Sequence, residues 1–564
     1  MAVKMSGEAR LLEFFKEHFD GWEIYCQPFV NGKRPDFALL HPQIGLGIFE
    51  VKDWELRSKD WKEYPSAIAQ ARGYRQLFEP MFFARHNALL NFPVTVGLIF
   101  TRASNSDVHK HFHEYLDGTP YTTLAGRETL ETVDIAQLFP LAIRRAPQRP
   151  TDEAANDLRS WLVEPHHSWE YRQPLDADPR QERFVTNAEG VKSRRMRGSA
   201  GSGKSVTLVR RAAKVAAEGK NVLFVCYNNA LINYLRDTCD RTGDANATQI
   251  EWRTFHSHCR SLFAQFDLSQ KFDELAKDSK NWDEVIPSCI SERIASSEQE
   301  ARKFHAIYID EGQDFNLSWW YLLRRCLRDD GEMMIAFDSA QQIYPRTDWN
   351  TETLRGAGIP GRWIELGGSR RLPNLLMPLL RSFAEQFHPK GLDCLPEKAA
   401  GMDCPCELRW VQVKPDKRVA TSVRELARII QRDAAPVSKA MSDLTFLSDR
   451  KDDCLEAETL LSKSGLAVTN SAHKEKALER KAKREFTMRK PTIKICTFQS
   501  FKGWQSRSVV ISIAQFAGSE DSAAFYTMLT RVKAHNLGSD LTVVCSAPRL
   551  RKFGSTFPDF EARE

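Results

Sequence analysis

Two short stretches of the chain carry residue types that bind and hydrolyse a nucleoside triphosphate. The first, residues 198–205, reads GSAGSGKS. Its glycines let consecutive backbone N–H groups surround phosphates, Lys204 supplies a positive charge, and the Ser205 hydroxyl can reach Mg²⁺. The residues expected to hold the nucleotide in this stretch are Gly198, Gly201, Ser202, Gly203, Lys204 and Ser205.

The second stretch, residues 307–315, reads IYIDEGQDF. Its apolar run predicts a strand that delivers Asp310 and Glu311 to the strand end. There Asp310 can hold Mg²⁺, and Glu311 can orient or deprotonate the attacking water. A strand ending near Met196 and a helix after the glycine-rich loop would aim the helix dipole at the phosphates. Together the two stretches predict an NTP-driven motor.

Composition sets the broad class of the protein. The chain has 564 residues, a formal net charge of +6 and a pI near 8.6. That length predicts roughly three or four domains, and the mild basicity is compatible with a polyanionic partner. The 12 cysteines include no Cys-x-x-Cys pair, which favours reduced thiols. Without an apolar run of about 18 residues or an N-terminal leader, we expect a cytoplasmic protein that has no membrane partner.

Turn signals and periodicity divide the chain into four parts. Residues 1–145 are predicted to form an α/β domain, with a helix near 8–18, strands near 22–29, 37–40, 45–51 and 94–100, and a helix after Pro65. Residues 146–172 form a proline-bearing linker. Residues 173–345 and 346–564 are expected to be the two lobes of the motor, the second with a small insertion. The short gaps between motor motifs leave little room for large inserted subdomains.

The run DEGQD at residues 310–314 resembles the DExQD signature of UvrD/Rep-type superfamily 1 helicases. Further matches to this family follow in the right order within residues 173–545. Residues 178–181, DPRQ, resemble the Q motif, in which the Gln181 amide can contact an adenine edge. The resemblance adds Gln181 and Gln313 to the nucleotide-binding residues.

Residues 221–229 and 254–257 resemble the DNA-contacting motifs Ia and Ib of that family. This resemblance places Thr254, Phe255 and His256 along a single-strand track, where aromatic faces stack on bases and polar groups contact phosphates. Residues 337–344, FDSAQQIY, resemble motif III with Phe337 in place of glycine. The resemblance makes Gln341 the sensor of the γ-phosphate and Tyr344 a second face for bases.

Three further segments resemble motifs IV to VI. Residues 366–371, LGGSRR, place Arg371 on the family's phosphate-contacting arginine, with Arg370 where the family has tyrosine. Residues 497–505, TFQSFKGWQ, resemble motif V with glutamines in place of its histidine and glutamate. Residues 525–533, FYTMLTRVK, resemble motif VI and make Arg531 the candidate arginine finger.

The resemblance implies two RecA-like lobes that use ATP and Mg²⁺ to move on single-stranded DNA in the 3′-to-5′ direction. One basic segment, residues 473–490, reads HKEKALERKAKREFTMRK. Phosphate neutralisation would make it a DNA-contacting arm, whereas a solvated amphipathic helix or loop would have the same composition. The sequence leaves both interpretations open.

The N-terminal part carries a second set of residues for phosphodiester chemistry. Asp36 precedes one predicted strand, and Glu50-Val51-Lys52 ends the next. Because strand residues two apart share a face, Glu50 and Lys52 emerge together. This spacing resembles PD-(D/E)xK nucleases, in which Asp36 and Glu50 would hold Mg²⁺ or Mn²⁺ and Lys52 would position the attacking water. Glu8 is a further candidate ligand from the first helix.

Downstream, Gln70 and Tyr74 lie four residues apart and so share one helical face. With Asp36, Glu50 and Lys52 they resemble the NERD, or nuclease-related, domain, which implies a restriction-endonuclease-like α/β fold. We therefore expect a metal-dependent nuclease fused to a helicase, acting in DNA repair or in defence against phage or plasmid DNA. An ATP-gated nuclease and a helicase with an inactive binding module are the alternatives, and a protein partner or a homo-oligomer remains open.

Overall fold

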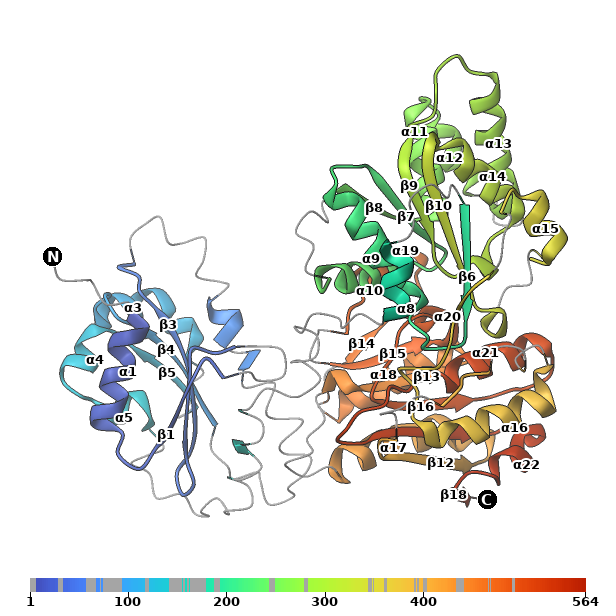
Figure 1. Ribbon diagram of the computed structural model, residues 1–564. Coiled ribbons are helices and arrows are strands. Elements are labelled where there is room, and N and C mark those ends of the chain that lie inside the picture. The colour runs from blue at the N-terminus through green and yellow to red at the C-terminus, as the bar shows by residue number, and fades with distance from the viewer. Residues whose placement is uncertain are drawn as a thin grey trace.

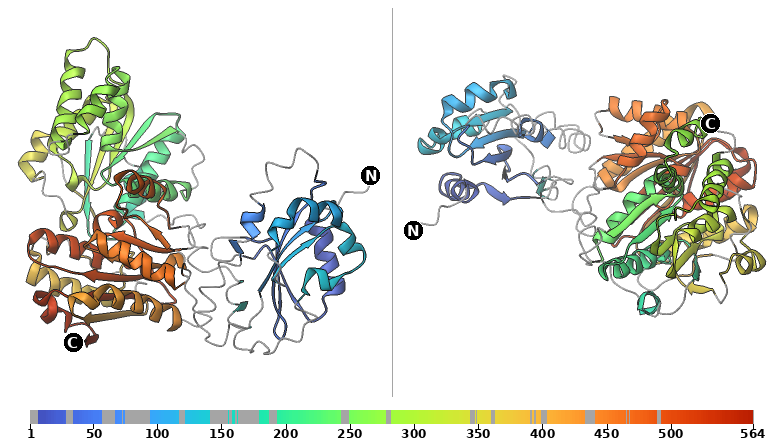
Figure 2. Two further views of the ribbon diagram at one scale, coloured as in Figure 1. Left: turned by 180° about the vertical axis from the view of Figure 1, so that it is seen from behind. Right: turned by 90° about the horizontal axis from the view of Figure 1, so that it is seen from above.

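The fold is described from a computed structural model in which three α/β units follow one another along the chain (Figure 1). The first unit lies beside the other two, which stack on each other, and the views in Figure 2 agree. The structure describes residues 7–28, 34–56, 67–71, 73–74, 94–116, 121–140, 155, 158–159, 162, 179–186, 193–242, 249–277, 282–342, 347, 349–359, 363–389, 392, 395–398, 403–432, 441–464, 466, 468–488 and 492–563.

The N-terminal unit is a mixed sheet in the order β1-β2-β3-β4-β5. β1 (Glu23–Cys26), β2 (Phe37–His41) and β3 (Gly45–Lys52) pair antiparallel, and β4 (Val94–Phe100) and β5 (Thr122–Ala125) continue the sheet in parallel. The helices are α1 (Gly7–His18), α3 (Asn105–Phe112), α4 (Arg127–Glu131) and α5 (Ile135–Leu138). Because α1 buries Leu11 and Phe15 in one cluster with Phe37 and Phe49, it covers one face of this sheet. The predicted α/β domain is present, with its strands at the expected places.

The second unit, which we call lobe 1, has a wholly parallel sheet in the order β11-β6-β10-β9-β7-β8. Its strands are β6 (Ser193–Gly198), β7 (Val222–Cys226), β8 (Ile250–Thr254), β9 (Phe304–Ile309), β10 (Leu327–Phe337) and β11 (Ile364–Leu366). Its helices are α8 (Pro179–Thr186), α9 (Lys204–Ala217), α10 (Asn229–Asp240), α11 (Phe255–Gln265), α12 (Ser269–Leu275), α13 (Trp282–Ser296), α14 (Leu317–Arg325) and α15 (Thr351–Gly356). Parallel strands end at one edge, so the glycine-rich loop after β6 and Asp310 after β9 meet there.

The third unit, lobe 2, has a parallel sheet in the order β14-β15-β13-β16-β17-β12-β18. Its strands are β12 (Cys406–Gln412), β13 (Leu444–Ser448), β14 (Val468–Asn470), β15 (Ile493–Thr497), β16 (Ser508–Ile513), β17 (Ser539–Cys545) and β18 (Asp559–Ala562). Its helices are α16 (Met377–Phe387), α17 (Arg418–Arg432), α18 (Lys451–Lys463), α19 (Lys476–Glu485), α20 (Phe498–Phe501), α21 (Ser519–Leu529) and α22 (Arg551–Gly554). The predicted fold class, an α/β domain followed by two RecA-like lobes, is confirmed.

The boundary between the two lobes lies later in the chain than the sequence predicts. β11 pairs with β6 of lobe 1, and Leu354, Ala357 and Ile359 belong to a lobe 1 core cluster. The predicted boundary between residues 345 and 346 therefore falls inside lobe 1, and the chain crosses to lobe 2 after Leu366. A strand as short as β11 has no periodicity that sequence reasoning could detect.

Two expectations from composition can be compared with the structure. Every cysteine in the described ranges is a free thiol, which fits the expected absence of a disulfide framework. Among the described helices, none combines the length and the apolarity that crossing a bilayer requires.

His258 on α11 is an unusual member of the lobe 1 core. It is 2% exposed and lies edge-on to Phe304. Neither of its ring nitrogens has a hydrogen-bond partner within the described ranges. Burial, reinforced by the nearby charges of Arg253 and Arg302, lowers the pKa of His258 to about 3. The folded protein therefore holds this imidazole neutral well below the pH at which a free histidine charges.

We predict that His258 makes the fold acid-sensitive. Between pH 6.5 and about 3 the unfolded chain binds a proton that the folded chain does not. Stability is therefore complete above pH 6.5 and falls by about 1.4 kcal/mol per pH unit below it. His258→Leu should flatten this dependence when thermal unfolding is followed from pH 7.5 to about pH 5. The exposed His109→Leu is the matched control and should keep the wild-type dependence; an identical slope in both variants would refute the assignment.

Candidate active site and nucleic-acid groove

The glycine-rich loop connects β6 to α9, as predicted, and Gln181 lies against it. Gly203 has a φ of +91°, and a Cβ at this position would collide with the Gln181 amide. Glycine is therefore required here both for the backbone conformation and for the close approach of that side chain. The Nε2 atom of buried Gln181 donates to the Ser202 carbonyl at 3.3 Å. α9 begins at Lys204, so the positive end of its dipole faces the loop.

Lys204 is held at the loop by three oxygen atoms. Its Nζ donates to the carbonyls of Gly198 at 2.7 Å and Ser199 at 3.0 Å, and to Asp338 Oδ2 at 3.0 Å. Asp338 follows β10 and is buried. The ends of the neighbouring strands β6 and β10 thus position the Lys204 ammonium group, which the sequence predicts to bind the phosphates.

Ser205 and Asp310 provide oxygen atoms that fit a divalent cation. Ser205 Oγ donates to Asp310 Oδ2 at 2.6 Å, so the two predicted ligands lie side by side. Burial, together with the neighbouring Glu311 carboxylate, raises the pKa of Asp310 to about 6. A buried carboxylate beside a second acid is stabilised by a nearby cation, and hard oxygen donors of this kind suit Mg²⁺.

Glu311 is placed and charged as a catalytic base would be. Its φ of +57° lies in the left-handed region, a strained conformation that is often found at functional residues. Gln313 Nε2 donates to its carboxylate at 2.5 Å. Burial would raise the pKa of Glu311, but the charges of Lys502, Lys204 and Arg531 outweigh burial and lower it. The carboxylate is therefore ionised and can accept a proton.

Two arginines, Arg371 and Arg531, lie in the same cavity as Lys204 and Glu311. Arg531, just after α21, is fully buried, and its Nη2 donates to Gln341 Oε1 at 2.6 Å. Burial, and then the charge of Arg371, lowers the pKa of Arg531 to about 9. The Nε and Nη2 atoms of Arg371 are buried without a hydrogen-bond partner in the described part of the chain. Both arginines line a cavity of about 260 Å³ together with Gln181, Lys204, Glu311, Asp338 and Gln341. Adjacent cations with unused donors favour an anion in this cavity, which we call the nucleotide cavity.

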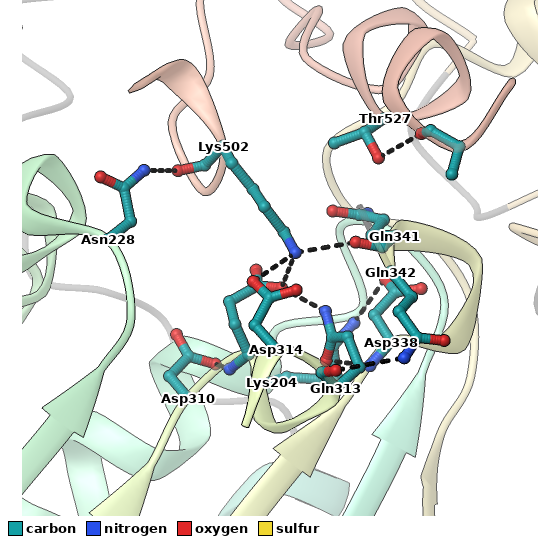
Figure 3. A network of polar contacts seen from close by, with 12 residues as sticks. Lys204, Asn228, Asp310, Gln313, Asp314, Asp338, Gln341, Gln342, Lys502 and Thr527 are labelled. Atoms are coloured by element: carbon teal, nitrogen blue, oxygen red, sulfur yellow. Dashed lines mark hydrogen bonds and ion pairs between the residues drawn. The ribbon is translucent and has the colours of Figure 1, made fainter. Parts of the chain in front are cut away.

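Lys502 of lobe 2 points into lobe 1, toward Asp314 and Gln341 (Figure 3). Its Nζ lies 2.7 Å from Asp314 Oδ2, 2.7 Å from the Gln341 carbonyl oxygen and 3.4 Å from Glu311 Oε2. Burial alone would lower the pKa of Lys502, but the carboxylates of Asp314 and Glu311 outweigh burial and raise it. The ammonium group is therefore charged and joins the two lobes.

α10 also connects the lobes, through polar contacts to the segment that resembles motif V. Asn228 Nδ2 donates to the carbonyls of Gln499 at 3.0 Å and Lys502 at 3.2 Å. In return, Trp504 Nε1 of lobe 2 donates to the Ala230 carbonyl at 3.1 Å. These bonds hold lobe 2 against the start of α10.

A second, larger cavity of about 790 Å³ lies between the lobes, and we call it the groove. Its lining contains the predicted residues Thr254 and His256. The other lining residues from the motif-like segments are Tyr227, Asn228, Asn229, Ser257, Asp314, Gln499, Ser500 and Lys502. Lys502 lines the groove together with its partner Asp314, whereas its other two partners, Glu311 and Gln341, line the nucleotide cavity. Lys502 therefore contacts residues of both cavities. The segments that resemble motifs Ia, Ib and V thus come together in space although they are far apart in sequence.

Phe255 corrects the predicted set of nucleic-acid contacts. It is 0% exposed and stacks on Trp319, with ring centroids 4.2 Å apart and planes at 9°. Thr254 caps α11 by accepting from Ser257 N at 3.3 Å, and the first helical turn directs Phe255 into the core rather than the groove. The other aromatic prediction in lobe 1, Tyr344, lies outside the described residues.

The predicted residues of the N-terminal domain converge on Glu50. Lys52 Nζ donates to Glu50 Oε1 at 2.8 Å, and Tyr74 Oη donates to Glu50 Oε2 at 2.9 Å. Gln70 Nε2 in turn donates to Tyr74 Oη at 2.9 Å. Asp36 Oδ2 accepts from Val51 N at 2.7 Å. Burial raises the pKa of both Asp36 and Glu50, and their mutual repulsion adds to the shift of Glu50. A buried and a half-buried carboxylate beside a lysine form a compact polar site.

Glu8 does not join this site. It is exposed on α1, and no hydrogen bond or ion pair connects it to Asp36 or Glu50 within the described ranges. The first turn of α1 instead approaches Thr101 and Asp53.

Within the described ranges, no three His, Cys, Asp or Glu side chains are grouped as metal ligands. A divalent cation here would rely on the Asp36 and Glu50 carboxylates, whose raised pKa values fit a cation partner.

Residues 181–346 match the family model of an AAA domain. The matched range includes the glycine-rich loop, Asp310, Glu311, Gln313 and Gln341. Together with the geometry, the match supports a P-loop, helicase-like ATPase region, which uses ATP and usually Mg²⁺ and acts on nucleic acid. A search of curated proteins found no match.

Sequence reasoning missed two features of the site. The resemblance to motif V marked residues 497–505, but nothing in the spacing indicated that Lys502 pairs with Asp314 across the lobes. Asp338 lies in the segment that resembles motif III, and the resemblance assigns it no role, although it pairs with Lys204. Both contacts depend on which strand ends are neighbours, and the sequence gives no direct signal of that.

We predict that Lys502→Met destabilises the protein by about 3–5 kcal/mol, because the buried carboxylates of Asp314 and Glu311 lose their counter-charge. A shift of the thermal unfolding temperature measures the effect. Removing both charges in Lys502→Met/Asp314→Leu should recover part of the loss, since an unpaired buried charge costs more than none. Lys463→Met, at the exposed end of α18, is the control. If Lys502→Met unfolded like that control, the ion pair would not hold the lobes together.

Proposed function

We propose that the chain is an ATP-driven motor that moves along single-stranded nucleic acid, with DNA as the expected substrate. The observation that carries this proposal is Lys502, whose ammonium group contacts Glu311 and Gln341 of the nucleotide cavity and Asp314 of the groove. Any change at the γ-phosphate that moves Glu311 or Gln341 therefore acts on a residue of the groove. The resemblance to UvrD/Rep-type helicases implies movement in the 3′-to-5′ direction.

Residues of both lobes have roles in the proposed hydrolysis of ATP to ADP and phosphate. Lys204 and the loop N–H groups bind the phosphates, and ionised Glu311 accepts the proton of the attacking water. Arg531 stabilises the negative charge on the transferred phosphoryl group. Ser205 and Asp310 would hold Mg²⁺, which would neutralise phosphate charge when bound. Because Arg531 belongs to lobe 2, hydrolysis requires the lobes to be together.

We propose further that the N-terminal domain is a metal-dependent nuclease. The cluster of Asp36, Glu50, Lys52, Gln70 and Tyr74 supports this, because it combines two carboxylates, one buried and one half-buried, with a lysine that can position water. Tyr74 and Gln70 orient the Glu50 carboxylate from the helical side. Fused to the motor, such a domain would cut the nucleic acid on which the lobes act.

Three substitutions test the motor site. Lys204→Ala should abolish ATPase activity, and Glu311→Gln should keep ATP binding but lose turnover. Arg531→Ala should lower turnover by about 10³-fold with little change in ATP affinity, because its charge acts on the transition state. Steady-state ATPase rates and equilibrium binding of a fluorescent ATP analogue separate these effects. The exposed Arg551→Ala on α22 serves as the matched arginine control. Equal losses of affinity and no specific loss of turnover would make Arg531 a ground-state contact.

The nuclease site is tested by Asp36→Ala, Glu50→Gln and Lys52→Ala. Each should stop Mg²⁺- or Mn²⁺-dependent cutting of DNA but leave ATP hydrolysis intact, because the two sites use different residues in different domains. Combined substitutions should lose no more than single ones, since residues that act as a unit fail together. Glu8→Gln is the control and should cut like wild type. If the triple variant also cut like wild type, the domain would be a binding module instead.

A further inference from the structure

The groove has a second wall that none of the motif-like segments supplies. Its lining from lobe 1 includes residues of α12 and the start of α13, and its lining from lobe 2 includes residues of α19. The residues of this wall are Arg260, Phe272, Asp273, Ala276, Lys277, Trp282, Arg480, Lys483 and Arg484. Five of these nine side chains are basic and one is acidic, so the wall favours a polyanion.

Trp282 of this wall stacks on His256, which belongs to the segment that resembles motif Ib. Their ring centroids are 4.5 Å apart with planes at 29°, and His256 Nε2 lies 2.9 Å from Asp283 Oδ1. The ring of Phe272 packs edge-on against that of Trp282, with centroids 6.0 Å apart. The Arg260 guanidinium lies over the Phe272 ring, 5.6 Å from its centroid. The stack is therefore held from several sides, while Trp282 remains only half-buried at the groove. A rigid, partly exposed indole of this kind suits a nucleobase.

α19 supplies the lobe 2 part of this wall and lies in the basic segment 473–490, for which the sequence left two interpretations open. Lys483 shares Glu479 with Lys451, each at 2.7 Å. Arg480 and Arg484, by contrast, have no acidic partner in the described part of the chain. They are exposed, one helical turn apart and on the groove. Two unneutralised guanidinium groups along one helix face match successive phosphates of a strand.

α19 is fixed in place by both lobes. Asn233 Nδ2 of α10 donates to the carbonyls of Arg484 at 2.7 Å and Phe486 at 2.8 Å. Phe486 is itself buried and packs edge-on against Trp504 at 5.2 Å. In Figure 1, α19 is seen among the lobe 1 helices although it belongs to lobe 2. The helix is thus a structural part of the groove, which argues against the alternative of a merely solvated surface segment.

We propose that α19 and the Trp282–His256 stack bind a single-stranded polynucleotide, with a base stacked on Trp282 and phosphates paired with Arg480 and Arg484. This inference rests on the proposed function of the groove and adds the wall that closes it. Stacking requires an unpaired base, so the wall selects single strands over duplexes. Neither contact reads a 2′-hydroxyl, so the wall binds DNA and RNA strands alike.

Binding of labelled 20-residue dT and U strands and of a blunt duplex to the full-length protein, over a series of salt concentrations, tests this proposal. Arg480→Ala/Arg484→Ala should reduce the slope of log affinity against log salt by roughly 1 to 1.5 units for both strands. Trp282→Ala should weaken single-strand binding roughly tenfold without changing that slope, and Trp282→Phe should restore part of it. Lys476→Ala/Lys481→Ala, on the same helix but not on the groove, is the charge-matched control.

The outcomes distinguish a failure of the proposed function from a failure of this inference alone. If wild type bound no single strand, the proposed function and this inference would both fail. If wild type bound but Arg480→Ala/Arg484→Ala kept the full salt slope, or lost no more of it than the control pair, the inference alone would fail. Equal binding of the duplex and the single strand by wild type would likewise overturn the role of Trp282. Binding of the fluorescent ATP analogue by each variant confirms that the lobes are folded.

Discussion

The structure depends most on one buried charge, the Lys502 ammonium group at the boundary between the lobes. Burying an ammonium is costly unless it is paired and hydrogen-bonded, and Lys502 satisfies this with Asp314, Glu311 and the Gln341 carbonyl. All three partners belong to lobe 1 and lie at the ends of parallel strands. The same contact therefore holds the two lobes together, keeps Glu311 ionised and joins the nucleotide cavity to the groove.

α10 is a second structural connection between the nucleotide cavity and the groove. Asn228 and Asn229 at its start line the groove, whereas Tyr234 and Thr238 further along line the nucleotide cavity. The helix is bound to lobe 2 through Asn228 at one point and through Asn233 at another. We propose that this helix, which lines both cavities and is fixed to the other lobe, carries the coupling between the two sites. The coupling proposed here would follow from packing and would need no separate signalling element.

Much of the site could be predicted because its chemistry is local in sequence. The loop at 198–205, the Asp310-Glu311 pair and the Glu50-Val51-Lys52 triplet each fix their own geometry through a turn or a strand alternation. Contacts between distant segments were beyond prediction, as Lys502 and α19 illustrate. The predicted nucleic-acid contact of Phe255 was wrong for a related reason. Its position between Thr254 and His256 suggested that it faces the groove, but the periodicity of the helix directs its side chain into the core. The predicted lobe boundary near residue 345 was wrong because β11, a strand of three residues, belongs to lobe 1 only through its pairing with β6.

The central claim is that the nucleotide cavity and the groove are energetically coupled through the contacts between the two lobes. Coupling of binding free energies is reciprocal, so one factor must describe both directions. The most direct measurement is the affinity of wild type for a labelled single strand with and without a non-hydrolysable ATP analogue, together with the analogue's affinity with and without the strand. We expect both ratios to agree, at about five- to 150-fold. Two affinities that do not respond to the other ligand would contradict the account.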